Sequence, residues 1–276
     1  MAGELIMILP RNDTSVVQQA GHPGDLCLLP DWIIKRTDIT EISQYENNET
    51  PGVAPDYRGP FFTVDEMRAA LKHEGVTLND SQQQKVLTMS EGIASGGRGF
   101  MLLENATSDM VNPALRDLKL GKYSASRTDQ ERHGVTGICE FIKIVRHAIM
   151  DHWSGSRARG FRDENRWKTS KTGDNLSELT AMLDTAGQHG LSNIRDNLHQ
   201  LQDWVNESNV IYVGMSVLVV VDPPPNDSGK AMAIDFEHPM RGRDDSFETH
   251  KSGLLEGLVN LRVIVNNYIS PTNPRF

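Results

Sequence analysis

Cysteine is scarce in this sequence, and two kinds of hydrophobic segment are missing. Cys27 and Cys139 are the two cysteines in 276 residues. Two are too few to hold a chain of this length together by disulfides, which favours a reducing, intracellular compartment, cytoplasmic or nuclear. No apolar run reaches about 18 residues, so we expect no membrane span. Glu4 precedes the short apolar run near the start and no basic stretch leads it, which argues against a secretory signal.

Several catalytic patterns are also absent. The sequence contains no HExxH, no CxxC and no GxSxG, so it gives no support to a zinc hydrolase or a serine hydrolase. The glycine-rich residues 94–99 lack the Lys-Ser/Thr of a phosphate-binding loop and do not precede a predicted helix. We interpret them as a hairpin turn.

Charge is unevenly distributed along the chain. The net charge of −9 argues against general nucleic-acid binding. Between Arg116 and Lys171, however, 13 Lys and Arg stand against 7 Asp and Glu, a local balance of +6, and the remainder carries −15. A basic segment on an acidic protein indicates a confined anion site, and a solvated helix with scattered basic residues is the alternative. The acidic exterior and the lack of coiled-coil heptads predict a monomer.

Hydrophobic spacing predicts strands mainly in the first half and helices mainly in the second. The predicted strands are two short ones around Pro30 within 24–36, the pair 85–93 and 98–105 joined by the hairpin turn, 112–121, and a second hairpin of 209–222 and 230–238. The predicted helices are 39–47, 65–73, 131–152, 174–205 (one helix, or two broken near Gly187–Gly190) and 251–268. The Pro/Gly-rich residues 49–62 predict a loop. This order indicates an α+β fold with two lobes, and clefts between lobes favour ligands.

The stretch NPALRDLKLG, residues 112–121, alternates charged residues with leucines. On a strand, Asp117 and Lys119 face the same way, toward water if the leucines face a core. They form a surface ion pair of little energetic value, or they hold a charged ligand. In the second case Lys119 neutralises a phosphate and Asp117 accepts from a hydroxyl.

Three other positions suit nucleotide chemistry. Lys35 ends an apolar strand and Glu41 follows on a short helix, so the lysine can reach phosphates while the glutamate holds it. Residues 100–105, FMLLEN, form an apolar strand with a polar end, as in a kinase hinge whose backbone reads adenine. Asp235, held in a strand, can bind Mg²⁺, with Glu237 on the same face. Each position also has a plain structural interpretation. Lys35 is then a strand-end lysine whose stem packs on apolar surface, residues 100–105 are an ordinary strand end, and Asp235 is a surface aspartate. Ser216 is interpreted as a small core residue.

Taken in order, these segments resemble the inositol polyphosphate kinase family, and its multikinase members in particular. Residues 112–121 match its PxxxDxKxG signature at Pro113, Asp117, Lys119 and Gly121. Further similar elements, spread over about 20–268, are GFMLLEN at the hinge, RGFR at 159–162, GMSVLVVVD, AIDFEH and GLLEGLVNL.

The resemblance implies a two-lobed fold, protein-kinase-like or ATP-grasp-like, with an ATP-binding lobe at 1–104 and a second lobe at 105–276. It further implies that ATP binds in the cleft and that its γ-phosphate is transferred, with the help of Mg²⁺, to a hydroxyl of an inositol polyphosphate. The implied roles are Lys35 on the ATP phosphates, Glu104 and its neighbours on adenine, Asp117 on the ribose or the acceptor hydroxyl, Lys119 on the transferred phosphate and the substrate, and Asp235 on the metal.

The same resemblance assigns the basic segment, about 122–171, to the inositol phosphate pocket. The expected phosphate contacts are Lys122, Arg127, Arg132, Arg146 and Arg162, since guanidinium groups suit bidentate phosphate binding. The chain departs from the family where Phe-Ala-His-Thr becomes Phe236–Glu237–His238–Pro239. Glu237 either binds a second Mg²⁺ or repels the substrate. This departure motivates one alternative, an inactive inositol phosphate or nucleotide sensor of the same fold. A kinase of another phosphorylated metabolite is a further alternative.

Overall fold

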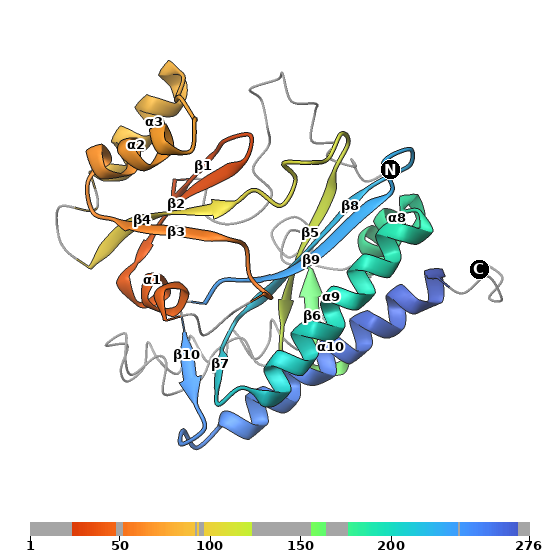
Figure 1. Ribbon diagram of the computed structural model, residues 1–276. Helices are drawn as coiled ribbons and strands as arrows, with labels where there is room; N and C mark the ends of the chain where they lie inside the picture. Colours follow the sequence, from red (N-terminus) through yellow and green to blue (C-terminus); the bar gives the residue numbers. More distant parts are fainter. Residues whose placement is uncertain are drawn as a thin grey trace.

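Two four-stranded antiparallel sheets organise the chain (Figure 1). The computed structural model describes residues 24–47, 52–91, 93, 97–122, 156–163, 176–236 and 238–269. The first sheet has the order β1-β2-β4-β3, built from β1 (Leu26–Leu28), β2 (Trp32–Asp38), β3 (Tyr57–Phe61) and β4 (Arg98–Glu104). The second has the order β6-β5-β8-β9, built from β5 (Ala114–Leu120), β6 (Phe161–Asp163), β8 (Ser216–Asp222) and β9 (Ser228–Ile234). A separate ladder pairs β7 (Val210–Tyr212) with β10 (Pro239–Arg241).

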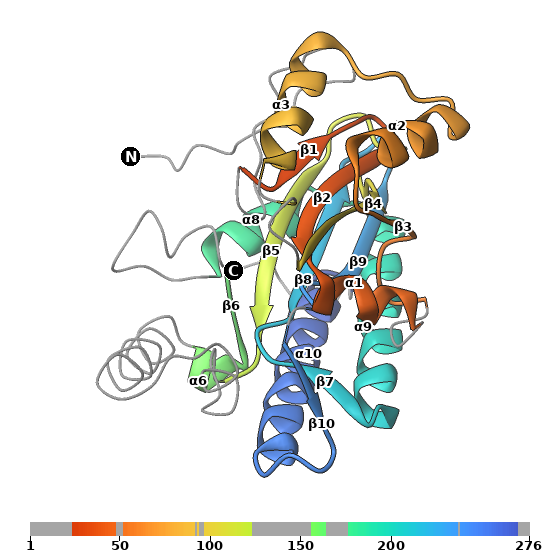
Figure 2. The ribbon, with the colours of Figure 1, turned by 90° about the vertical axis from the view of Figure 1, so that its left-hand side faces the viewer.

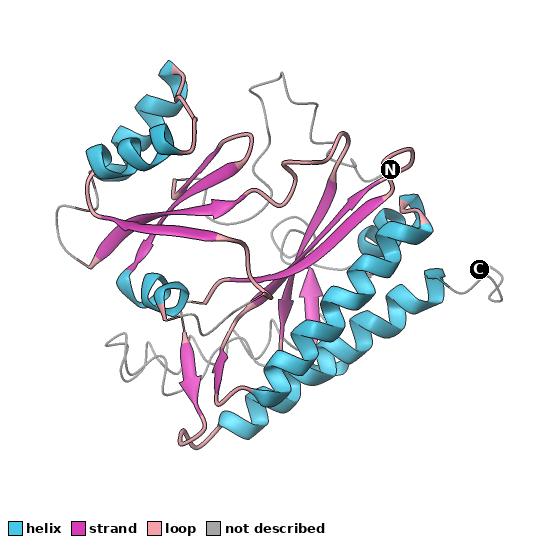
Figure 3. Ribbon diagram, in the orientation of Figure 1, coloured by secondary structure: helices cyan, strands magenta, loops and turns pink. Residues whose placement is uncertain are grey.

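Each helix packs with one of the two sheets (Figure 3). With the first sheet go α1 (Ile39–Glu46), α2 (Val64–His73) and α3 (Asp80–Ser90). With the second go α6 (Ser156–Arg159), α8 (Ser177–Thr185), α9 (Gln188–Glu207) and α10 (Phe247–Ile269). The α+β class predicted from the sequence is confirmed. The boundary between lobes at residue 104 stays a prediction, although β4 ends at Glu104 and β5 begins at Ala114.

Period-two alternation gives the first sheet two different faces. Ile34 on β2 packs with Phe100 and Leu102 of β4 against α2 and α3, in one apolar cluster. The neighbouring positions on β2 face the other way. Ile33 packs against the large core of the second sheet, and Lys35 is bonded to groups on α1 and after β9. The face with Ile34 therefore has a core of its own, whereas the opposite face, which carries Ile33 and Lys35, shares the large core of the second sheet.

The second sheet is covered on one side by α9 and α10. In both views these helices lie alongside it, on the side away from α2 and α3 (Figures 1 and 2). Leu118, Val217 and Val219 of the sheet share a core cluster with Leu198 of α9 and Leu258 of α10. Burial of this apolar surface fixes which side chains of β5 and β8 face the opposite side.

One predicted hairpin is wrong. Residues 85–93 were predicted as a strand, but α3 occupies Asp80–Ser90. Asn79 caps this helix by accepting from the Gln82 amide, and the Gln82 side chain accepts in return from the Asn79 amide. The local capping box outweighs the β-branched character of the segment, so Arg98–Glu104 has no partner strand at 85–90. Residues 94–96 of the predicted turn lie outside the described residues. Arg98–Glu104 is a strand as predicted.

Other predictions are confirmed with adjusted limits. The two strands around Pro30, the helices at 39–47 and 65–73, the 112–121 strand and the final helix are present. The 174–205 region is two helices, broken between Thr185 and Gln188, and the long 209–222 strand divides at Gly214, which has φ +80°. The 49–62 loop contains β3. The predicted 131–152 helix lies outside the described residues.

Within the part of the chain that the structure describes, none of the helices is both long enough and apolar enough to cross a bilayer.

The turn before β6 meets α10 backbone to backbone. Gly160 has φ +72°, and a Cβ there would lie 2.5 Å from the Gly257 nitrogen and 2.8 Å from its Cα. We predict that Gly160→Ala lowers the free energy of unfolding by about 3–5 kcal/mol, because neither backbone can yield. Gly75→Ala is the matched control: it has φ +74° and nothing within 4 Å, so it should cost about 1–2 kcal/mol. Urea titrations of both variants measure the difference, and equal losses would contradict the close-packing argument.

Candidate active site

The carboxylate of Asp235 lies between two lysines from different sheets. Lys35 Nζ on β2 is 3.3 Å from Asp235 Oδ1, and Lys119 Nζ on β5 is 4.0 Å from Asp235 Oδ2. The three positions are up to 200 residues apart in sequence. The structure thus brings together the three residues that the sequence argument depends on.

Lys35 is held on its other side by a fully buried carboxylate. Glu41 of α1 accepts from Lys35 Nζ at 2.8 Å, from the Thr37 hydroxyl at 2.6 Å and from the Phe236 amide at 3.4 Å. Burial opposes the charged form of Lys35, but the carboxylates of Glu41 and Asp235 outweigh it and hold the pKa of Lys35 above its ordinary value. Lys35 is therefore a fixed positive charge. Thr37 and the Phe236 amide were not anticipated, because a sequence does not show which groups complete a buried carboxylate.

Asp235 has a backbone conformation that is uncommon outside glycine. Its φ is +65°, immediately after β9 ends at Ile234. Aspartate tolerates this left-handed region better than most residues. The turn ends the strand and directs the carboxylate toward Lys35 and Lys119, while the next ring, Phe236, is fully buried.

A row of polar side chains crosses the second sheet at the level of Lys119. Lys119 is paired in register with Arg162 on β6 and with Ser216 on β8. Residues directly opposite in antiparallel strands share a face, so these side chains lie on the Lys119 side. Ser216 is buried, and its Oγ has no hydrogen-bond partner among the described residues. The interpretation of Ser216 as a core residue is right about burial but missed this placement, which depends on strand register.

Asp117 shares the face of Lys119 but not its exposure. Its side chain is 4% exposed, so the expectation that it faces open water is wrong. The reason is that the linker after β4 folds over this face: Ala106 and Met110 pack with Leu218 and Met232 there. Leu218, paired with Asp117, belongs to this apolar patch.

Glu104 lies at the end of β4, where the chain passes between the sheets. Its side chain is 3.4 Å from Lys230 Nζ on β9, and its amide donates to the Asp56 carbonyl. The Asn105 amide donates to the Asp31 carbonyl, and its side-chain amide donates to Leu29 and Pro30. The linker is therefore anchored to both sheets.

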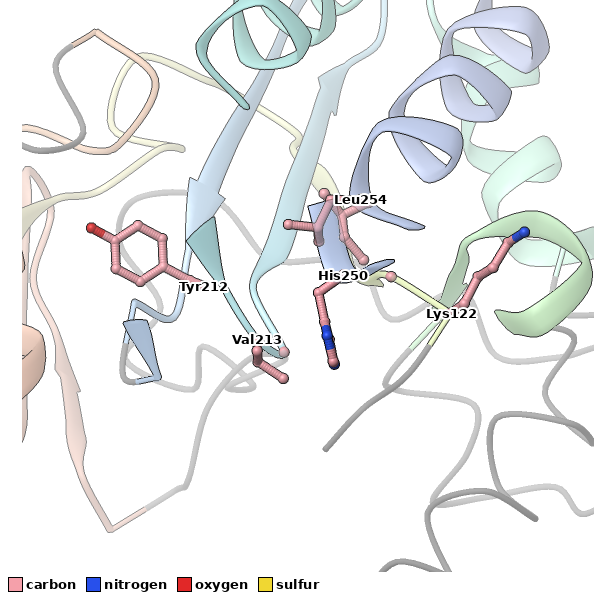
Figure 4. A pocket seen from close by; sticks show the side chains of 8 residues that line it. Lys122, Tyr212, Val213, His250 and Leu254 are labelled. Atoms are coloured by element: carbon pink, nitrogen blue, oxygen red, sulfur yellow. The ribbon is translucent and has the colours of Figure 1, made fainter. Parts of the chain in front are cut away.

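The predicted substrate contacts are only partly described. Arg162 is 3% exposed on β6. Lys122, just after β5, pairs with Glu256 of α10 at 2.5 Å and lines a small pocket with Gly214 and His250. In that pocket the Lys122 side chain points away from His250 (Figure 4). Arg127, Arg132, Arg146, Glu237 and almost all of the basic segment lie outside the described residues.

The oxygen donors near Asp235 suit a hard divalent cation. Among the described residues there is no group of three or more His, Cys, Asp or Glu that could hold a metal by itself. Mg²⁺ typically uses one or two carboxylates and completes its shell with water and phosphate oxygens. One carboxylate, with the buried Ser216 hydroxyl one strand away, fits a cation that arrives with a nucleotide.

Comparisons with known proteins point to one family. The sequence profile of the inositol polyphosphate kinase family matches residues 100–266. The fold is similar to that of the inositol phosphate multikinase Ipk2 of S. cerevisiae, solved in complex with ADP and Mn²⁺, with a TM-score of 0.57 and 15% identity over 87% of this chain and 100% of that one. A second inositol phosphate multikinase structure matches with a TM-score of 0.43 and 18% identity over 60% of this chain and 84% of that one. No curated protein sequence matches the chain.

The fold and the site place a charged centre, formed by Lys35, Lys119 and Asp235, between two antiparallel sheets. The profile covers more than half of the chain, so this protein belongs to the inositol polyphosphate kinase family.

The Thr37 hydroxyl satisfies a buried carboxylate that has no access to water. We predict that Thr37→Val, which keeps the side-chain shape, lowers the free energy of unfolding by about 1.5–3 kcal/mol, since it removes a hydrogen bond to a charged group. Thr180→Val is the control: Thr180 bonds back to Leu176 within α8, and its loss should cost less than about 0.5 kcal/mol. Chemical denaturation measures both, and a Thr37 variant as stable as the control would contradict the role given to this bond.

Proposed function

We propose that this protein transfers the γ-phosphate of ATP to a hydroxyl of an inositol polyphosphate, assisted by Mg²⁺. The observation that carries the proposal is the sharing of Asp235 between Lys35 of the first sheet and Lys119 of the second. Two ammonium groups and a metal-binding carboxylate then lie within the span of one triphosphate. Membership of the family and the likeness to a fold solved with ADP and Mn²⁺ support the same reaction.

Phosphoryl transfer needs little covalent help from a protein, because positioning and charge stabilisation supply most of the rate. In this proposal Lys35 binds phosphate oxygens of ATP, held in place by Glu41. Lys119 contacts the transferred phosphoryl group and the substrate. Asp235 holds the divalent cation, which neutralises charge on the phosphates when bound.

The nucleoside end lies in this proposal against the linker and the apolar patch of the second sheet. Leu218 and Met232 are buried with Ala106 and Met110 in an apolar cluster, which supplies the apolar side of the base site. The amides of Glu104 and Asn105 already donate to the carbonyls of Asp56 and Asp31, just before β3 and β2, so a base is read by the remaining backbone groups of the linker. Asp117 lies two residues before Lys119 on the same face, where it contacts the ribose or orients the acceptor hydroxyl.

The acceptor is an inositol ring with several phosphates. A highly anionic substrate needs concentrated positive charge, and Arg162 and Lys119 are paired on one face of the sheet. The basic segment, about 122–171, supplies further cationic groups in this proposal, including Lys122, Arg127, Arg132 and Arg146.

Asp235→Asn tests the proposal most directly. The amide keeps the size and tolerates the left-handed backbone, but it loses the charge that binds the cation. We expect kcat with Mg-ATP and an inositol tris- or tetrakisphosphate to fall about 100-fold or more, with little change in thermal unfolding temperature. ADP release and the phosphorylated product, separated by anion-exchange chromatography, are the measurements.

Asp184→Asn is the matched control, because Asp184 is an exposed carboxylate on α8. It should leave turnover unchanged. A folded wild-type protein that binds nucleotide and inositol phosphate yet transfers no phosphate to a panel of inositol phosphates would overturn the kinase proposal and favour a sensor. Transfer to a different phosphorylated metabolite, and to no inositol phosphate, would overturn the proposed substrate and keep the kinase activity.

A further inference from the structure

Next to Asp235, a buried cluster of edge-to-face aromatic rings connects α1 with β7. The Phe236 ring lies between Tyr45 of α1 and Tyr212 of β7, with centroid distances of 5.2 Å and 4.9 Å and edge-on angles of 72° and 68°. Phe236 and Tyr212 are fully buried, and Tyr45 is nearly so. The residue that directly follows Asp235 is thus packed between α1 and the second lobe.

A hydrogen bond runs across the same junction. The Tyr212 hydroxyl donates to Gln44 Oε1 at 3.2 Å, and the Gln44 amide group donates to the Thr40 carbonyl at 3.2 Å. Gln44 is 5% exposed. It lies three residues after Glu41, so the two side chains are neighbours on α1. In Figure 1, α1 lies between the first sheet and the β7–β10 pair, and Tyr212 is a residue of β7.

The helix that carries Glu41 is too short to fix its own orientation. It has eight residues, and helices of this length owe their stability to tertiary packing. A rotation of α1 by a fraction of a turn would move Glu41 away from Lys35 and from the Phe236 amide together. α1 also packs on β2, β3 and β4. On the side of the second lobe, the contacts that resist such a rotation come from Tyr212 of β7 and from Phe236.

We propose that Gln44 and Tyr212 are positioning residues for phosphoryl transfer. Their hydrogen bond sets the rotation of α1 against the second lobe, which keeps Glu41 on Lys35 and on the backbone next to Asp235. Lys35 and Asp235 are then already placed to bind the same nucleotide, and α1 does not have to move. This inference rests on the proposed kinase function and adds two residues that do not touch the nucleotide.

Tyr212→Phe and Gln44→Leu test the inference, because each removes the bond and keeps most of the packing. We expect kcat to fall about tenfold in each, since displaced catalytic groups lose alignment. The KM for inositol phosphate should stay within about twofold, because Lys119 and Arg162 lie on the other sheet. The affinity for Mn²⁺ in the presence of a non-hydrolysable ATP analogue, measured by electron paramagnetic resonance, should fall by a similar factor. The double variant should be no worse than either single one, because the two groups act through one bond.

Two controls separate positioning from general damage. Tyr57→Phe removes a buried hydroxyl from a ring 5.3 Å from Tyr45, and this hydroxyl has no hydrogen-bond partner among the described residues. It should leave kcat and Mn²⁺ affinity unchanged. Gly75→Ala lowers stability far from the site and should also leave both unchanged.

The kcat values and the Mn²⁺ affinities decide between the inference and its alternatives. Loss of kcat in the two variants and not in the controls supports the inference, and kcat values equal to the controls overturn it. If wild-type protein binds Mn²⁺ with the analogue but shows no turnover, the proposed kinase function fails, and Mn²⁺ affinity decides the inference. Weaker binding in the two variants then supports positioning at Asp235, and unchanged binding overturns it. A wild-type protein that binds neither metal nor analogue overturns both.

Discussion

The ion pair between Lys35 and the buried Glu41 is the interaction on which the rest of the site depends. A carboxylate with no exposure is tolerated only when its oxygens are bonded, and Glu41 is bonded to Lys35, Thr37 and the Phe236 amide. Lys35 and Thr37 come from β2, and the Phe236 amide comes from the segment after Asp235. Satisfying one buried charge therefore fixes the relative positions of α1, β2 and the end of β9.

The second sheet contributes chemistry through register. Lys119, Arg162 and Ser216 are aligned across β5, β6 and β8 because the apolar positions on the other face are packed under α9 and α10. A shift by one residue would turn the polar row into the core, so the burial of the opposite face specifies the site. The close approach of Gly160 to Gly257 brings the turn before β6 directly against α10, which fixes the strand that carries Arg162.

The family signature was recoverable from the sequence because its residues sit at fixed local spacings. Asp117 and Lys119 share a face through strand periodicity, and the aspartate in AIDFEH follows an apolar strand. The two failures have different causes, one local and one long-range. The segment predicted as a strand at 85–93 is largely helix α3, which begins with a capping box. Hydrophobic content does not reveal this local hydrogen-bond pattern. Asp117 was expected in water, but a linker from another part of the chain covers it.

The sequence by itself determined which functional groups are available: an ammonium at residue 35, an acidic residue after an apolar strand, and the Pro, Asp, Lys and Gly of the family signature. These features can be recognised because they depend on residues only two to eight positions apart. Tertiary structure alone decided that Lys35, Lys119 and Asp235 share one point, that Thr37 and a backbone amide complete Glu41, and that Tyr212 reaches Gln44 across 168 residues. The physical reason is that local periodicity sets which way a side chain faces. What it meets there depends on which distant surfaces are buried together.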